Sequence, residues 1–399
     1  MSMRKCIVGG ILAILLVGAF IIVKGDDPPK ADFTWNPINP STADTVHFYD
    51  ASTPQTNITE WIWNFGDGGG STEQNPTHKY ARPGTYTVTL VVVWNISGNL
   101  TADIAEKNIT IANQPPVADA GPDQILNTKT VVLNGSNSYD PDGEIVSYEW
   151  DFGDGSTGEG KIVQHTYEND GVYTVTLNVT DDYGDWDTDT CQITIDTSKP
   201  KTTVKLNGTL GKNDWYISNV TVSFVVNETT SGVNKTMYKL DDGNWTEYTS
   251  PFNISQEGEH LLLFYSIDNA GNKEDTKNAT IKIDKTKPSV SILTPEEKKL
   301  YIFGRKILPT FRKTIILGKI TVSLNATDNL YMDYVLILVN GEEMANFTSP
   351  PYEWKWGGAI GNKNLTVEAY DEAGLKGVDS MDVFIVSLFK PISIKAAIE

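Results

Sequence analysis

The sequence is short of the residues on which most metalloenzymes depend. It holds two cysteines, Cys6 and Cys191, and four histidines in 399 residues. Cys6 adjoins the N-terminal apolar run, so the remaining chain has one thiol and no internal disulfide is expected. Neither a His-Glu-X-X-His nor a Cys-X-X-Cys motif occurs. A catalytic metal held by nitrogen or sulfur ligands is therefore not expected.

Positive charge is also scarce. The 32 lysine and arginine residues stand against 51 acidic residues, for a net charge of −19. Nucleic acid is a poor partner for such a chain, because binding it requires a basic surface that displaces counterions. Divalent cations, basic proteins and carbohydrates remain open as partners.

A long apolar run occurs once, at the N-terminus. Arg4 and Lys5 precede this run, which extends from Ile7 to Val23, and acidic residues follow it. The pattern predicts a hydrophobic helix within residues 1–25 that directs the rest of the chain out of the cell. A cleaved signal peptide and a retained membrane anchor both fit it. In either case the protein is expected to be extracellular or on the cell surface.

The tripeptide Asp151-Phe152-Gly153 is the one that holds magnesium in protein kinases, but its context differs. The glycine-rich phosphate loop, the strand lysine and the H-R-D loop of a kinase are missing from the sequence. The stretch recurs at residues 63–68 as WNFGDG, where Asn64 replaces the aspartate. We therefore predict a strand followed by a tight turn, in which Asp154 accepts hydrogen bonds from turn amides.

This recurrence belongs to a longer duplication. Residues of the first copy return 87 positions later: Trp63, Gly66, His78, Tyr80, Gly84 and Tyr86 become Trp150, Gly153, His165, Tyr167, Gly171 and Tyr173. Because His78 and His165 repeat, packing contacts are expected of them rather than metal ligation. Proline-bearing linkers at similar spacing predict four modules. The predicted boundaries are 1–25 for the signal or anchor, 26–113, 114–197, 198–286 and 287–388 for the modules, and 389–399 for a tail.

The modules show the two-residue period of β-strands. In GVYTVTLNVTDD the apolar residues share one face and the polar residues the other, the apolar ones being Tyr173, Val175, Leu177 and Val179. No helical apolar stripe of useful length follows residue 25. The sequence predicts an all-β fold, a tandem array of four immunoglobulin-like β-sandwiches after the N-terminal hydrophobic helix.

Two motifs follow each other in the second module, YEWDFGDGS and HTYENDGVYTVTLNVTDDYG, after NGSNSYDPDGEI. Residues 114–197 thereby resemble the PKD domain, an immunoglobulin-like sandwich common in archaeal and bacterial surface proteins. Residues 28–113 resemble it through WNFGDG and HKYARPGTYTVTL but lack the Asp-Pro-Asp-Gly. Residues 200–285 and 288–387 resemble other Ig-like modules of such proteins. The resemblances imply two PKD domains and two bacterial-type Ig-like domains, with surface display or adhesion and no reaction.

Calcium is the main candidate for metal chemistry. Asp140 and Asp142 lie two apart in SYDPDGE, and carboxylate oxygens are ligands that calcium prefers. The resemblance to calcium-binding PKD domains implies that Asn113 and Asp181 complete the site. The ion would then lie beside the linker between the first two modules and stiffen the joint. The alternative is a plain surface turn with unpaired acids.

The first module is expected to lack this site. Thr53-Pro54-Gln55 lies near the place of the Asp-Pro-Asp-Gly, and Trp94-Asn95 replaces the acidic turn at Asp181. Without carboxylates at these places, calcium would find too few hard oxygen ligands.

The sequence is rich in N-glycosylation motifs. Sixteen Asn-X-Ser/Thr triplets occur, more than a random chain of this composition would hold, and they favour exposure outside the cell. The alternative is that threonine-rich β-proteins accumulate such triplets without selection. The candidates are Asn57, Asn95, Asn99, Asn108, Asn134, Asn178, Asn207, Asn219, Asn227, Asn234, Asn244, Asn253, Asn278, Asn325, Asn346 and Asn364.

Three tryptophans and one basic segment are candidate contact surfaces. Trp186 and the pair Trp354 and Trp356 are candidates for sugar contact, because aromatic rings outside a core stripe can stack on carbohydrate. Residues 296–319 are predicted to insert an extra hairpin into the fourth module. Its cations either dock on an anionic partner or are simply solvated; they are Lys298, Lys299, Arg305, Lys306, Arg312, Lys313 and Lys319.

Together these features predict a non-enzymatic protein that serves as a spacer, adhesin or envelope-assembly component. Its expected partners are cell-surface proteins or polysaccharides, and the membrane if the N-terminal segment is retained. Calcium in the second module is the one cofactor expected. The alternative is an accessory or polysaccharide-binding component associated with a secreted hydrolase, since PKD modules often accompany secreted proteases and glycosidases.

Overall fold

The computed structural model describes residues 29–388. The helix predicted within residues 1–25 and the tail 389–399 lie outside the described residues. Between residues 29 and 388 all regular structure is β-strand, which confirms the all-β prediction for the modules. In this part of the chain no helix is long and apolar enough to cross a membrane.

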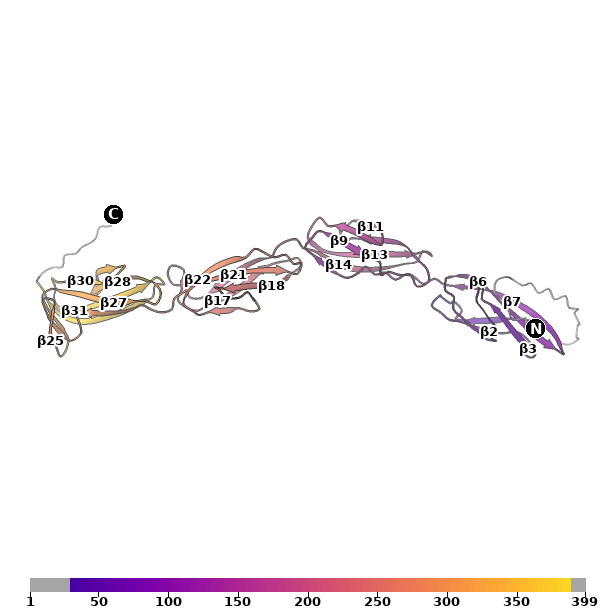
Figure 1. Cartoon of the computed structure of the whole chain (residues 1–399), viewed down its shortest axis with the longest axis horizontal. Coiled ribbons are helices and arrows are strands. Elements are labelled where there is room, and N and C mark those ends of the chain that lie inside the picture. The colour runs from indigo at the N-terminus through magenta and orange to yellow at the C-terminus, as the bar shows by residue number, and fades with distance from the viewer. Residues whose placement is uncertain (1–28, 389–399) are drawn as a thin grey trace. The chain divides into compact units, whose positions relative to one another are not determined.

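The strands form eight sheets, and each of the four modules contains two of them (Figure 1). The chain also divides into two compact units. The first unit runs to Pro122 and adds Val132–Gln164 and Thr174–Cys191. The second unit comprises Asp123–Val131, His165–Tyr173 and the chain from Gln192 onward.

The first module pairs a three-stranded sheet with a four-stranded one. The smaller sheet has the order β1 (Phe33–Asn36), β2 (Val46–Asp50), β5 (Thr77–His78). The larger has the order β4 (Gly70–Ser71), β3 (Ile58–Asn64), β6 (Gly84–Ile96), β7 (Asn99–Ile111). Buried rings from both sheets meet in the core, as where Phe33 lies edge-on to Trp63 with 5.3 Å between ring centroids.

The second module has a five-stranded and a two-stranded sheet. The larger has the order β11 (Thr157–Glu159), β10 (Ile145–Asp151), β13 (Gly171–Asp181), β14 (Trp186–Ile195), β8 (Gln124–Leu126). The smaller consists of β12 (Ile162–Thr166) and β9 (Thr130–Asn134). In β13, Val175, Leu177 and Val179 are buried while the residues between them are half-buried, which confirms the predicted alternation.

The third module repeats this plan. One sheet has the order β15 (Lys201–Asn207), β17 (Val220–Asn227), β20 (Phe252–Ile254). The other has the order β16 (Trp215–Tyr216), β22 (Lys277–Ile283), β21 (Gly258–Asp268), β18 (Val233–Leu240), β19 (Thr246–Glu247). Its core joins residues of both sheets, among them Val222, Phe264 and Ile281.

The fourth module has the widest sheet. Its smaller sheet has the order β23 (Ser289–Thr294), β27 (Ile320–Thr327), β30 (Glu353–Trp356). The seven-stranded sheet has the order β25 (Arg305–Pro309), β24 (Lys299–Ile302), β26 (Thr314–Leu317), β32 (Lys376–Val386), β31 (Ile360–Asp371), β28 (Met332–Val339), β29 (Glu342–Phe347). The basic segment supplies β24, β25 and β26, so it widens this sheet.

The WDFGDG stretch is a strand end followed by a turn. Gly153 and Gly155 have φ of 79° and 92°, a region that favours glycine. Asp154 Oδ1 accepts the Ser156 N–H at 3.0 Å, as predicted. Asp151 Oδ1 accepts the Gly153 N–H at 2.9 Å.

The first copy of the turn uses the same bond. Asn64 Oδ1 accepts the Gly66 N–H at 2.9 Å, which explains why asparagine and aspartate can exchange there. His78 is a packing residue, because its ring stacks on Phe65 at 4.2 Å and its Nε2 lies 2.7 Å from Asp67 Oδ2. Both copies are thus a strand end followed by a glycine turn, as the sequence predicted.

Candidate functional site

The predicted calcium ligands lie at the first junction, the region where the linker after β7 meets the loops of the second module. Asp142 is 8% exposed and lies in the loop before β10. Its Oδ2 accepts hydrogen bonds from the Thr42 hydroxyl and, at 3.1 Å, from the Gln114 N–H. The carboxylate therefore binds residues on both sides of the module boundary.

Asn113 and Asp181 form the second half of the site. Asp181 ends β13 and is 1% exposed. The Asn113 amide donates to Asp181 Oδ2 at 2.7 Å and to Asp185 Oδ2 at 2.8 Å. Asp181 Oδ1 accepts the N–H groups of Tyr183 and Asp185, each at 2.9 Å. The turn after β13 thus fixes this carboxylate.

Three oxygens at this junction lack hydrogen-bond partners although they are buried. They are Asn113 Oδ1, Asp140 Oδ2 and Asp142 Oδ1. Burial raises the pKa of Asp140, and the negative charges of Asp142 and Asp181 add to the rise. Leaving buried acceptors unsatisfied costs free energy, and like charges add to the cost. A bound calcium ion would satisfy all these oxygens, so the four predicted residues fit the ion.

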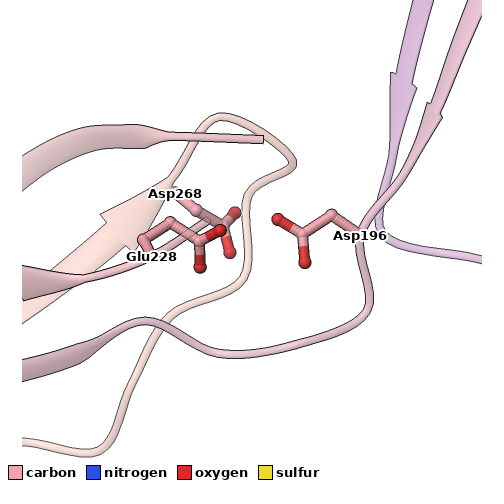
Figure 2. A group of neighbouring side chains, drawn as sticks. All are labelled: Asp196, Glu228 and Asp268. Carbon is pink, nitrogen blue, oxygen red and sulfur yellow. The ribbon is translucent and has the colours of Figure 1, made fainter. Parts of the chain in front are cut away.

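A second group of acids, which the sequence did not indicate, lies at the second junction, where the linker after β14 meets the third module. Oxygens of Asp196, Glu228 and Asp268 all lie within 4.8 Å of one another. Figure 2 shows the three carboxylates turned toward a common point from three separate segments. Asp196 follows β14, Glu228 follows β17 and Asp268 ends β21.

Hydrogen bonds orient this second group. Asp196 and Asp268 are 0% exposed. Asp196 Oδ2 accepts the N–H of Ser231 at 3.2 Å and also its hydroxyl. Asp268 Oδ1 and Oδ2 accept the Asn272 backbone and side-chain N–H groups at 2.8 and 2.9 Å. Three acidic side chains are therefore held close together in a largely buried place.

One signal in the sequence could have found this group. Asp268 lies 87 positions after Asp181, and each begins an acidic turn at the end of a strand. Glu228 gave no signal, because it stands inside the sequon at Asn227.

The three tryptophans predicted to contact sugar differ in exposure. Trp186 is 63% exposed and stays a candidate for sugar contact. Trp356 is only 3% exposed and belongs to the core of the fourth module, so its prediction as a sugar-stacking surface was wrong. Trp354 stacks on Trp356 with 5.7 Å between centroids. Residues two apart share one face of a strand, so both rings of β30 face the core, with Trp354 half-buried at its margin.

The sequon asparagines lie on the surface. Of the sixteen, fifteen are exposed and Asn178 is half-buried. In the basic segment, Lys306 pairs with Glu296 at 2.5 Å, and Lys313 donates to Asn362 Oδ1 at 2.9 Å. These two cations thus have partners within the module.

Comparison with known families decides the nature of the first two modules. The model of the PKD domain matches residues 26–111 and 113–195. The first two modules are PKD domains. The later modules, with two sheets each, continue the tandem array of Ig-like sandwiches.

Curated relatives match this chain over part of their length. The chain is 33% identical to the pre-pro-metalloprotease PrtV of Vibrio cholerae over 128 residues, 32% of this chain and 14% of that protein. It is 26% identical to collagenase ColA of Clostridium perfringens over 199 residues, 41% of this chain and 18% of that protein. The chain thus spans less than a fifth of the length of these relatives.

A solved structure of a single PKD domain also matches. The crystal structure of the PKD1 domain of Vibrio anguillarum Epp is 37% identical and covers 22% of this chain and 100% of that chain, with a TM-score of 0.20.

Proposed function

We propose that this protein is a non-enzymatic extracellular array that serves as a spacer or adhesin at the cell envelope. The surface position of the sequons supports it most directly, since fifteen of the sixteen asparagines are exposed and they occur in all four modules. Glycosylation requires such access and occurs on exported chains. Its partners are surface proteins or polysaccharides that contact the exposed faces of the sandwiches.

The glycosylation part is tested by intact-mass analysis and glycopeptide mapping of the protein from its native cells. We expect a mass well above that of the unmodified chain, with glycans on the exposed asparagines and little or none on Asn178. The same mass reports whether the N-terminal segment is removed. A protein at the mass of 399 unmodified residues would refute the glycosylated form of the proposal.

The second PKD domain binds calcium in this account. Asn113, Asp140, Asp142 and Asp181 would supply oxygens to the ion, which neutralises their charge and satisfies their unpaired atoms. Because Asn113 precedes the domain and the others belong to it, the ion would fasten the linker to the loops. The first PKD domain, with Gln55 and Trp94 near the corresponding places, would have no ion.

Thermal unfolding of the full-length chain in millimolar calcium and in chelator tests this site. We expect calcium to raise the melting temperature of the second module, and Asp142→Asn to remove most of that rise. Asp242→Asn, which changes an exposed aspartate of the third module, is the matched control and should retain it. Superimposable curves for the second module in the two solutions would end the idea.

A second candidate function is support of a secreted hydrolase. The observation that favours it is the similarity to PKD domains of a metalloprotease and a collagenase, together with the exposed ring of Trp186. Co-sedimentation with insoluble collagen or polysaccharide tests it. Trp186→Ala should abolish sedimentation, whereas Trp245→Ala, at a ring that is 40% exposed, should not. Absence of sedimentation of the unaltered chain would favour the spacer role.

A further inference from the structure

Three of the four modules have an aspartate at one equivalent strand position. The aspartate lies in the penultimate strand of its module, opposite the residue that precedes a β-bulge in the neighbouring strand. The pairs are Asp181 with Ile145, Asp268 with Val233 and Asp371 with Met332. A shared register at a bulge makes the positions equivalent, although only the first lies in a PKD domain.

The three aspartates are held in the same way. Each is at most 1% exposed. Oδ1 of each accepts the N–H of the residue four positions later, at 2.9 Å for Asp181 and at 2.8 Å for Asp268 and Asp371. The turn after the strand therefore fixes Oδ1 of each aspartate. The second oxygen accepts a side-chain amide in Asp181 and in Asp268, and it lacks a hydrogen-bond partner in Asp371.

Two further oxygen-bearing side chains accompany each aspartate. One comes from just past the last strand of the preceding module, and the other from the loop that leads into the bulged strand. The first kind comprises Asn113, Asp196 and Asp284, and the second comprises Asp142, Glu228 and Asp328. The same positions therefore bear oxygen ligands at the second junction and at the third, where the linker after β22 meets the fourth module. Within residues 29–388, only the acids of the second junction have ligand oxygens that all lie within 4.8 Å of one another.

At the third junction the acids accept backbone hydrogen bonds, but two of their buried oxygens lack a partner. Asp371 is 0% exposed and Asp284 is 2% exposed. Asp328 Oδ1 and Asp371 Oδ2 are buried and lack hydrogen-bond partners. Burial and the negative charges of Asp371 and Asp328 raise the pKa of Asp284 to about 6. These unpaired oxygens are the independent sign that a ligand belongs here.

The preceding module encloses the third junction. The Lys212 N–H donates to Ala373 O at 2.9 Å, and the Asn213 amide donates to Glu372 O at 3.1 Å. The ring of Trp215 lies 5.7 Å from that of Tyr331. The turn that follows Asp371 therefore contacts the third module across the module boundary.

We propose that the second and third junctions each bind one calcium ion, through Asp196, Glu228 and Asp268 and through Asp284, Asp328 and Asp371. Within residues 29–388 no lysine or arginine forms an ion pair with these six acids. Their ligand atoms are all hard oxygens, which favour calcium over zinc or copper. None of the six belongs to the site proposed in the second PKD domain, so the two proposals can fail separately.

Calorimetric titration of the full-length chain with calcium chloride at neutral pH measures the number of calcium ions bound per chain and so tests the sites. We expect Asp268→Asn and Asp371→Asn each to lower the number of bound ions by one. Asp242→Asn should change nothing, and Asp142→Asn should act only on the first junction. A number that neither Asp268→Asn nor Asp371→Asn lowers would overturn the proposal.

Trypsin gives a second readout that does not depend on binding heat. Lys285 lies in the linker of the third junction before Thr286, whereas Lys287 precedes a proline and resists the protease. Cleavage requires local opening, so calcium should slow the cut after Lys285 by at least about tenfold. Trypsin activity is matched between calcium and chelator with a peptide substrate.

The variants decide the outcome of this experiment. Asp371→Asn keeps an oxygen that can accept the Leu375 N–H and should abolish the protection by calcium. Asp242→Asn should retain the protection. Equal cleavage rates after Lys285 in calcium and in chelator, for the unaltered chain, would overturn the proposal at the third junction.

Discussion

One equivalent strand position sets the first module apart from the three that follow. In β6 this position is Trp94, which pairs with Ile58 just before the β-bulge. The indole is 0% exposed and its N–H donates to Pro54 O at 2.8 Å. In the other modules an aspartate takes the same place.

The difference shows two ways of closing the end of a sandwich. Trp94 fills its place with apolar surface and satisfies its own polar atom, so the end is complete without a ligand. The aspartates instead gather negative charge in buried places, and we propose that a calcium ion neutralises it. We therefore expect the first module to be stable without an ion and the other three to depend on calcium for part of their stability.

The largest expected effect comes from removing the buried indole of Trp94. Trp94→Ala should lower the free energy of unfolding of the first module by about 3 to 5 kcal/mol, because it opens a cavity in a buried core. The loss should be the same in calcium and in chelator. Calorimetric melting of the full-length chain measures it, and a calcium-dependent loss would place an ion in the first module after all.

Removal of calcium should come next in size. An ion present at a hundred times its dissociation constant stabilises its module by about 2.7 kcal/mol. Chelator should therefore lower the melting temperature of each of the last three modules by roughly 10 °C. The first module should melt unchanged. Differential scanning calorimetry separates the transitions, and a uniform shift of all of them would contradict the comparison.

A smaller effect should change sign with calcium. Asp371→Asn removes a ligand charge when the ion is bound, and it relieves repulsion from neighbouring acids when the ion is absent. We expect a loss of about 1 to 2 kcal/mol in calcium and a gain of about 1 kcal/mol in chelator. Urea unfolding in the two solutions measures both. A loss of equal size in each would mean that the carboxylate only supports the fold.

The smallest effect is the acid response of the first module. Partial burial pushes the pKa of Asp50 upward, but hydrogen bonds from Ser52, Trp61 and Gln55 outweigh it and hold the pKa below its usual range. A lowered pKa adds stability above the unfolded value that is lost as pH falls through the folded value.

In chelator the first module should therefore lose up to about 1 kcal/mol as the pH falls below roughly 4. Melting curves from pH 6 to pH 3 measure the loss, and Asp50→Asn should flatten the dependence. If that variant keeps the full dependence, other groups control the acid response.

Much of the fold could be predicted because its signals are local. The alternation of β13 and the 87-residue echo of Trp63 in Trp150 follow from strand geometry and duplication, and they identify sandwiches and PKD domains without a structure. The sequence also shows directly that Trp94 stands in the first module where the second has Asp181.

The ion sites of the later modules could not be read in the same way. Their ligands come from segments far apart in the chain, as with Asp196, Glu228 and Asp268, and only the fold brings these together. The error at Trp356 has a related cause. Sequence shows that the two tryptophans share one face of β30 but does not show that this face packs on the core.

We expect each of the last three modules to hold one calcium ion and the first module to hold none. Native mass spectrometry of the full-length chain, produced without glycans and exchanged into a calcium-containing volatile buffer, tests it most directly. We expect three retained calcium ions per chain, and two after Asp371→Asn. A chain that retains none, or only one, would contradict it.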